Sequence, residues 1–140
     1  MLNKFNSTIT LKNKIGVVIP KAECNPYAMN YMEHIEAFES FFAVAFGGAT
    51  KQEITGAYKM ENGITAYDDS IFVYAWYSEI TPAQEDVFVA MVNSLKEDLE
   101  QESIGIEYNG NFTLVFWYLE RVATLSGCYS QLDTKKKGID

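Results

Sequence analysis

The sequence predicts an α+β fold of the ferredoxin-like split βαβ type, with an antiparallel sheet, two helices on one face and an extra C-terminal hairpin strand. Two observations lead to this prediction. Hydrophobic patterns along the chain follow the order strand, helix, strand, strand, helix, strand, and a further strand pattern comes at the end. The pairs Asn62-Gly63 and Asn109-Gly110 separate successive strand patterns, and Asn-Gly is typical of tight hairpin turns.

The chain is expected to form one α+β domain over residues 1–132, followed by a polar, disordered tail over 133–140. Its 140 residues are 48% hydrophobic, which is enough for a core that needs neither disulfides nor a metal. The N-terminus lacks the apolar segment of a signal peptide, and no apolar run is long enough to cross a bilayer. We therefore expect a cytoplasmic protein without a membrane partner.

The first strand is expected over residues 15–19, with Pro20 ending it. A helix then follows, with Asn25 as the N-cap, Pro26 in the first position and Gly47-Gly48 as the stop. Apolar residues spaced three and four apart predict its buried stripe. They are Met29, Met32, Ile35, Phe38, Phe42 and Ala45.

Two strands follow, around the turn at residues 62–63, and the second runs to about residue 79. Asp68-Asp69 predicts a bulge or break in this strand, because aspartate is depleted in strands. The second helix begins after Thr81, an N-cap that forms a capping box with Gln84, and Pro82 takes the first position. Its predicted buried stripe consists of Phe88, Met91, Val92, Leu95 and Leu99.

The last hairpin is expected around Asn109-Gly110, within residues 103–118. Residues 119–132 remain ambiguous, and a short helix ended by Gly127 is one interpretation.

The strand at residues 71–77 is apolar on both faces. Ile71, Val73, Ala75 and Tyr77 point one way, and Phe72, Tyr74 and Trp76 point the other. The first set is expected to face the helices, which leaves the aromatic trio on the open face of the sheet. Such a patch marks a contact surface. Residues 119–140 or 1–12, a second copy of the protein or a foreign partner are the three candidates for covering it.

The net charge of -8 excludes a general nucleic-acid binder, which needs a positive surface. Cys24 and Cys128 lie far apart in the sequence and are interpreted as free thiols in a reducing compartment. Three groups of residues resemble ligand sites, and a structural role is favoured for each of them. The segment GGAT at 47–50 is interpreted as a helix stop rather than a phosphate loop. His34 has no second ligand one turn away, and Asp68, Asp69 and Glu79 are interpreted as solvated carboxylates rather than a cation site.

The succession of IGVVIP, a helix ending in FGGAT, GAYKMENG and an aromatic strand resembles a group of uncharacterised small α+β proteins of bacteriophages and other mobile elements. The resemblance covers residues 15–108 and rests on a GGAT…GAY pattern. Such proteins often carry a glutamate shortly after the hairpin turn. This chain has Tyr67, Asp68 and Asp69 there, so no role for that glutamate is carried over. The resemblance implies an accessory role against host defence, in the host cytoplasm.

The first functional hypothesis is a non-enzymatic inhibitor of a host defence protein, such as a CRISPR effector nuclease, acting as a homodimer without cofactor or metal. It would bind a basic host protein, and not nucleic acid directly, through acidic and aromatic surfaces. The expected partner-binding residues are Phe72, Tyr74, Trp76, Tyr58, Tyr67, Asp68, Asp69 and Glu79.

Two further hypotheses stay open. One is a small-ligand binder or enzyme, including a sponge for a nucleotide signal, in which Tyr58, Tyr67, Tyr74 and Trp76 stack on a flat ligand. A phosphate on such a ligand would need basic contacts, for which the sequence offers Lys51, Lys59 and Arg121. The other is a structural subunit that only self-assembles.

Overall fold

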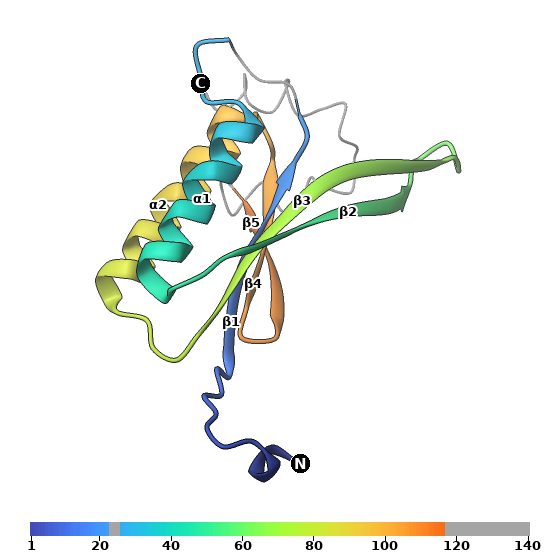
Figure 1. The fold of residues 1–140 in the computed structure, drawn as a ribbon. Coiled ribbons are helices and arrows are strands. Elements are labelled where there is room, and N and C mark those ends of the chain that lie inside the picture. Colours follow the sequence, from blue (N-terminus) through green and yellow to red (C-terminus); the bar gives the residue numbers. More distant parts are fainter. Residues whose placement is uncertain (23–25, 117–140) are drawn as a thin grey trace.

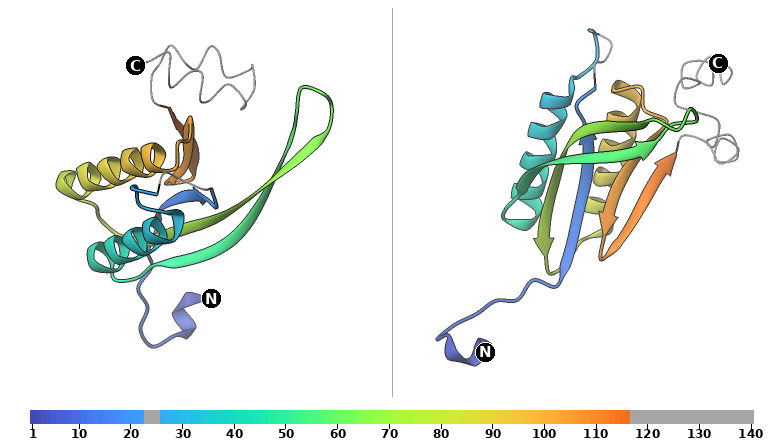
Figure 2. Two further views of the ribbon diagram at one scale, coloured as in Figure 1. Left: turned by 90° about the horizontal axis from the view of Figure 1, so that it is seen from above. Right: turned by 90° about the vertical axis from the view of Figure 1, so that its right-hand side faces the viewer.

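The computed structural model describes residues 1–22 and 26–116, which form a five-stranded antiparallel sheet with two helices packed on one face (Figures 1 and 2). The strand order is β2-β3-β1-β4-β5, which is the order of a split βαβ sheet with one hairpin strand added at the edge. The predicted fold class is therefore confirmed. The elements are η1 (Leu2–Lys4), β1 (Asn13–Pro20), α1 (Tyr31–Phe46), β2 (Thr50–Lys59), β3 (Thr65–Tyr77), α2 (Pro82–Asp98), β4 (Ser103–Tyr108) and β5 (Asn111–Phe116).

The start of α2 agrees with the prediction, and the start of α1 does not. Thr81 and Gln84 form the expected capping box, with Pro82 as the first helical residue. The helix α1 begins at Tyr31, because Asn30 accepts from the Glu33 amide while the Glu33 side chain accepts from the Asn30 amide. Asn25 has no Glu or Gln three residues later, so the later site satisfies two helix-end donors instead of one.

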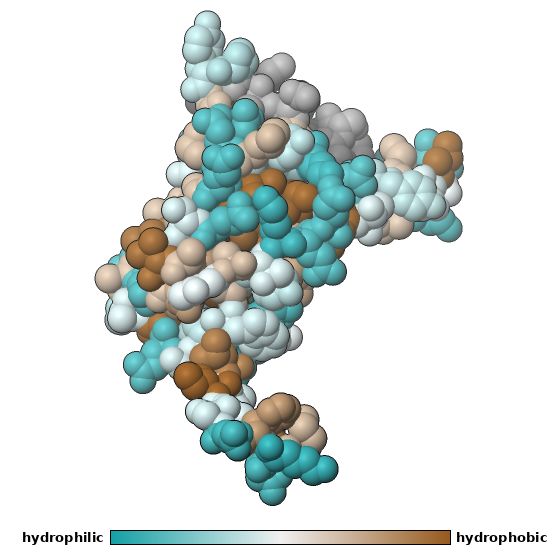
Figure 3. All heavy atoms as spheres, viewed as in Figure 1, coloured by the Kyte–Doolittle hydropathy of each residue, from teal (hydrophilic) through white to brown (hydrophobic). Residues whose placement is uncertain are grey.

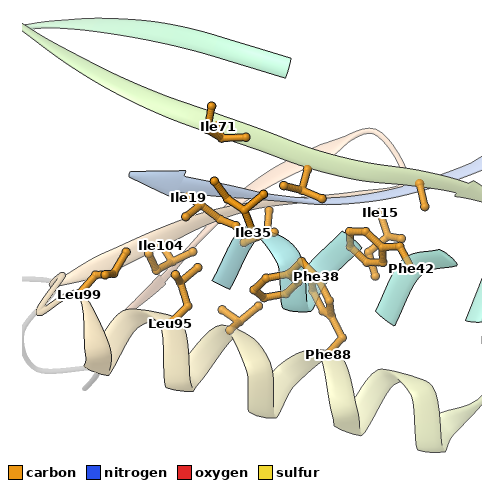
Figure 4. Close-up of a cluster of buried hydrophobic side chains, with 14 of the residues drawn as sticks. Ile15, Ile19, Ile35, Phe38, Phe42, Ile71, Phe88, Leu95, Leu99 and Ile104 are labelled. Atoms are coloured by element: carbon orange, nitrogen blue, oxygen red, sulfur yellow. The ribbon is translucent and has the colours of Figure 1, made fainter. Parts of the chain in front are cut away.

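The core lies between the two helices and the sheet (Figure 4). Residues 15, 17 and 19 of β1 and residues 71, 73, 75 and 77 of β3 face the helices, as expected for strands covered on one side. Rings from both helices meet there, and Phe42 stacks on Phe88 with centroids 6.1 Å apart. The core consists of Ile15, Val17, Ile19, Ile35, Phe38, Phe42, Ile71, Val73, Ala75, Tyr77, Phe88, Val92, Leu95, Leu99 and Ile104.

The predicted stripe of α1 is correct for Ile35, Phe38 and Phe42 and wrong for the two methionines before them. Met29 precedes the helix, and Met32 is 58% exposed. His34 is buried in their place. Its Nε2 lies 2.8 Å from Oδ2 of Asp98 in α2, and this bond satisfies the buried ring nitrogen and ties the two helices together.

The strand β3 runs without a bulge through Asp68-Asp69, and its register with β2 is unbroken from Lys59↔Thr65 to Thr50↔Tyr74. The prediction of a bulge or break is wrong. The β1 strand pairs only with residues 70–77 of β3, so residues 55–69 form a two-stranded hairpin arm that projects beyond the sheet (Figure 1). Water reaches the aspartates on this arm, and Thr55 donates to Asp69, so the charges need no break in the ladder.

Residues 1–12 extend away from the sheet before β1 begins (Figures 1 and 2). Across the described ranges, no helix is long and apolar enough to cross a membrane. The expectations for Cys24, Arg121, Cys128, residues 119–132 and the tail at 133–140 all lie outside the described residues.

Candidate functional site: an aromatic platform on the open sheet face

The structure places Phe72, Tyr74 and Trp76 on the open face of the sheet, as the alternation of β3 predicted. Their neighbours Ile71, Val73 and Ala75 are buried under the helices, whereas Trp76 is 47% exposed. Phe112 and Leu114 of β5 are also exposed, and the alternation of β5 puts them on the same face. The open face therefore carries large apolar side chains that no described part of the chain buries.

Two glycines allow aromatic rings to lie across the sheet. A Cβ atom built on Gly16 of β1 would lie 2.6 Å from two ring carbons of Phe72, and one built on Gly105 of β4 would lie 2.4 Å from the Phe112 ring. Glycine inside a strand weakens it and is found where another group must approach the backbone closely. Here that group is a phenyl ring in each case. The Phe72 ring also stacks on Tyr74, at 5.1 Å and 24°.

A cation sits over these rings. The Lys14 Nζ lies 5.2 Å, 4.5 Å and 5.6 Å from the ring centroids of Phe72, Tyr74 and Trp76. It also lies 3.2 Å from Oε1 of Glu107. The strand order produces this arrangement, because β1 is flanked by β3 on one side and β4 on the other. We call Lys14, Phe72, Tyr74, Trp76 and Glu107 the aromatic platform.

A hollow of about 290 Å³ lies beside Trp76. The loop from Gly47 to Thr50 lines it, together with Leu11, Phe46 and Ala75. The interpretation of this loop as a helix stop is confirmed, since Gly47 has a left-handed φ of 89° and donates its amide to the Ala43 carbonyl. The GGAT segment therefore ends α1 and also lines the hollow beside Trp76.

The remaining predicted site residues do not form one cluster with the platform. By alternation, Tyr58 and Asp68 lie on the platform side of the hairpin arm, and Tyr67 and Asp69 lie on the opposite side. Glu79 is exposed in the loop after β3. Their roles in binding stay predictions.

No group of three or more His, Cys, Asp or Glu side chains in the described ranges is placed to hold a metal ion. The sequence offered no second ligand one turn away from His34, and the structure places Asp98 of α2 beside it. His34 is buried, the Asp98 side chain is 27% exposed, and the pair joins the helices on the far side of the sheet from the platform, so it serves packing.

Sequence reasoning missed Lys14, Glu107, Gly16 and Gly105. The signal was present in two short stretches, NKIGVVI and IGIEY, in which a charged residue and a glycine alternate with core aliphatics. A glycine and a charged residue on the same face of a strand indicate that this face does not belong to the hydrophobic core. Strand order, which joins residues 14, 74 and 107, is not readable from either stretch alone.

The platform has the chemistry to bind a flat ligand, a cation or a ligand that is both. Aromatic faces attract cations and stack on planar rings. The Lys14–Glu107 pair offers one charge of each sign to a ligand that carries the opposite ones. Both side chains are about a quarter exposed, so a ligand can reach them.

Comparison with known proteins finds a solved structure of similar fold. A phage SAM lyase in complex with S-methyl-5'-thioadenosine matches with a TM-score of 0.51 and 14% identity, over 81% of this chain and 98% of that chain. The apo state of phage SAM lyase matches with a TM-score of 0.44 and 15% identity, over 76% and 91% of the two chains. No family model matches the chain, and no curated protein does.

This comparison corrects the functional prediction. The matched protein is a lyase, which is an enzyme. This contradicts the expectation of a non-enzymatic protein and gives no support to an anti-CRISPR role or to host-defence inhibition by binding. The weak similarity to a phage protein agrees with the coarser part of the resemblance seen in the sequence. The GGAT…GAY pattern itself is not tested by it.

Proposed function

We propose that the protein is a lyase that cleaves S-adenosylmethionine and releases S-methyl-5'-thioadenosine, with the aromatic platform as its substrate site. The observation that carries this proposal is the position of the Lys14 Nζ, over three aromatic rings and 3.2 Å from Glu107. The platform already holds one cation on ring faces. The shared fold with a phage SAM lyase supports this choice among cationic, ring-bearing ligands.

The substrate matches the platform group by group. S-adenosylmethionine carries a planar adenine, a sulfonium cation, an ammonium and a carboxylate. Adenine and sulfonium suit the faces of Phe72, Tyr74 and Trp76. The carboxylate suits Lys14, and the ammonium suits Glu107. Binding would exchange the internal Lys14–Glu107 pair for two pairs with the ligand.

The hollow beside Trp76 is the place where the adenosine end of the substrate would lie. The loop Gly47–Thr50 lines this hollow and would offer backbone donors and acceptors to a ligand there. An adenine stacked on Trp76 would present its polar edge to them. The amino-acid end would then extend toward Lys14 and Glu107.

The proposed reaction balances with the substrate alone. The bond between sulfur and the four-carbon chain breaks, and S-methyl-5'-thioadenosine leaves as a neutral thioether that needs no proton. The four-carbon fragment either closes onto its own carboxylate oxygen or loses a neighbouring proton to a base. Glu107 is the carboxylate of the platform that would take that proton in the second case.

The proposal also includes three expectations from the sequence, namely a cytoplasmic location, a phage origin and a homodimer. A cytoplasmic, phage-encoded lyase of this kind would meet its substrate in the host cytoplasm. A second copy of the chain covering Phe112 and Leu114 would exclude water from the platform, in line with the predicted homodimer.

The test is incubation of the purified protein with S-adenosylmethionine, followed by chromatography with mass detection of S-methyl-5'-thioadenosine and the four-carbon product. Formation of S-methyl-5'-thioadenosine at a rate proportional to protein supports the proposal, and its absence above the spontaneous rate contradicts it. Glu107→Gln and Tyr74→Ala should each lower kcat/KM at least about tenfold. Glu79→Gln, an exposed carboxylate off the platform, is the matched control.

A further inference from the structure

A second pocket lies on the opposite side of the sheet, between α1 and the edge strand β2. Its volume is about 440 Å³, and Ile35 and Ile71, both nearly buried, contribute to its apolar part. Figure 3 shows an apolar surface between these two elements with hydrophilic residues around it. The residues lining the pocket are Lys21, Tyr31, Met32, Ile35, Lys51, Gln52, Glu53 and Ile71.

Charges of both signs lie around this pocket. The Lys21 Nζ lies 2.9 Å from Oε1 of Glu53, and this hydrogen bond raises the pKa of Lys21. The Lys51 Nζ lies 3.6 Å from Oε2 of Glu39, and the Lys51 side chain is 58% exposed. The first pair is short, and its Glu53 side chain is 78% exposed, so a ligand can reach that carboxylate. The second is long and open to water, so Lys51 can turn toward a ligand at little cost.

We propose that this pocket binds a zwitterionic amino acid with an extended apolar side chain, as a site separate from the aromatic platform. The ligand carboxylate would lie between Lys21 and Lys51, and its ammonium would lie against Glu53. The side chain would cover Ile35 and Ile71, beside Met32. An ammonium nitrogen has three N–H donors, so Lys21 can keep Glu53 while it donates to the ligand.

The charge pattern selects this class over simple anions and over phosphates. A phosphate would bring two charges close to Glu53 and Glu39, and like charges at that range repel. A fatty acid would satisfy the lysines and leave Glu53 without a new partner. The volume exceeds that of a small polar ligand and lies within the range of small-molecule sites.

The two sites are independent because the sheet lies between them. Ile71 faces this pocket, and the next residue, Phe72, faces the platform. Loss of one site therefore leaves the other intact. The amino-acid site can be tested whether or not the protein is a lyase.

The test is a calorimetric titration of the full chain with three probes that share one apolar chain. They are L-norleucine, hexanoate, which lacks the ammonium, and pentylamine, which lacks the carboxylate. L-norleucine should bind at least about tenfold more tightly than either of the others. Equal binding of norleucine and hexanoate, or no binding of norleucine at millimolar concentration, overturns the proposal.

Variants assign the site. Lys51→Ala should weaken norleucine about tenfold, whereas Lys59→Ala, which removes a lysine at the far end of the same strand, should leave it unchanged. Equal losses in both variants, or no loss in either, contradict the assignment. Cleavage of S-adenosylmethionine by Lys51→Ala should equal that of the parent, and saturating norleucine should not change it. Inhibition by norleucine in the parent would show one shared site and overturn the claim of two.

Discussion

The two faces of the sheet are built from the same strands but carry different kinds of side chain. On the helix side, Ile15, Val17 and Ile19 of β1 pack to near-complete burial. On the open side, the alternating residues of the same strand are Lys14, Gly16 and Val18, and aromatic rings from β3 lie over this part of the strand. On the helix side, buried apolar side chains pack together and stabilise the fold. On the open side, a glycine and a lysine alternate along β1, and the aromatic rings beside them stay accessible to a ligand.

The largest expected difference between the faces is in the free energy of unfolding. Phe42→Ala empties a fully buried site surrounded by other rings and should cost about 3–5 kcal/mol. Phe112→Ala on the open face removes a ring that is 64% exposed and should cost less than about 1 kcal/mol. Denaturant titration of both variants measures the contrast. Equal losses would mean that Phe112 belongs to a second core.

The helix side also holds a polar contact whose loss should be measurable. His34→Ala leaves the Asp98 carboxylate without its 2.8 Å partner and opens space between the helices, so it should cost about 1–3 kcal/mol. Asp98→Asn keeps the size and a hydrogen-bonding group and should cost less. Thermal unfolding of the pair of variants checks the order, and a larger loss for Asp98→Asn would contradict the role given to the bond.

Gly16→Val tests whether the position of the Phe72 ring on the open face matters for ligand binding. The new side chain would displace the Phe72 ring, which lies 2.6 Å from the added Cβ, at a cost of about 1–3 kcal/mol in stability. Affinity for S-methyl-5'-thioadenosine should fall by a larger factor than in Gly56→Val, where an added Cβ meets nothing within 4 Å. Unchanged affinity would remove Phe72 from the ligand site.

Trp76→Glu should change self-association while leaving the fold intact. The helix-facing neighbours Val73 and Ala75 are untouched, so circular dichroism should match the parent. Light scattering should report a smaller mass if a second copy covers the indole. Outright unfolding of the variant with a monomeric parent would invert the assignment of the two faces.

The smallest expected effect is a pH dependence on the helix side. Burial lowers the pKa of Lys96, whose Nζ donates to the Phe116 carbonyl. The folded state therefore releases this proton before the unfolded state does, and stability gains as the pH rises through the folded pKa toward the ordinary value of 10.5. Denaturation in alkaline buffers should show this gain in the parent and not in Lys96→Met. The same gain in both would assign it to another group.

The sequence was most informative where local chemistry decides the structure. Thr81 with Gln84 and the two Asn-Gly pairs each act within a few residues, and all are correct. The start of α1 was missed because Asn25-Pro26 and Asn30 with Glu33 are competing signals, and only the second gives reciprocal bonds. The prediction of a bulge at Asp68-Asp69 was wrong, because a hairpin arm with water on both sides tolerates charged side chains.

The residues of the proposed site were only partly predictable from the sequence. Alternation placed Phe72, Tyr74 and Trp76 together, since they belong to one strand. Lys14 and Glu107 reach them only through the strand order, which depends on contacts between distant segments. Without that cation and carboxylate, the trio and the acidic net charge favour a protein-binding surface, and that interpretation led to the non-enzymatic hypothesis that the comparison contradicts. A role of the trio in self-association stays a prediction.

The central claim is that the aromatic platform binds the adenosine end of the substrate, and the emission of Trp76 reports on it directly. The chain has two tryptophans, so Trp117→Phe leaves Trp76 as the single emitter. Titration of this variant with S-methyl-5'-thioadenosine should give a saturable change in Trp76 emission, and adding Tyr74→Ala should weaken the affinity about tenfold. Binding detected by calorimetry without any change in Trp76 emission would contradict the account.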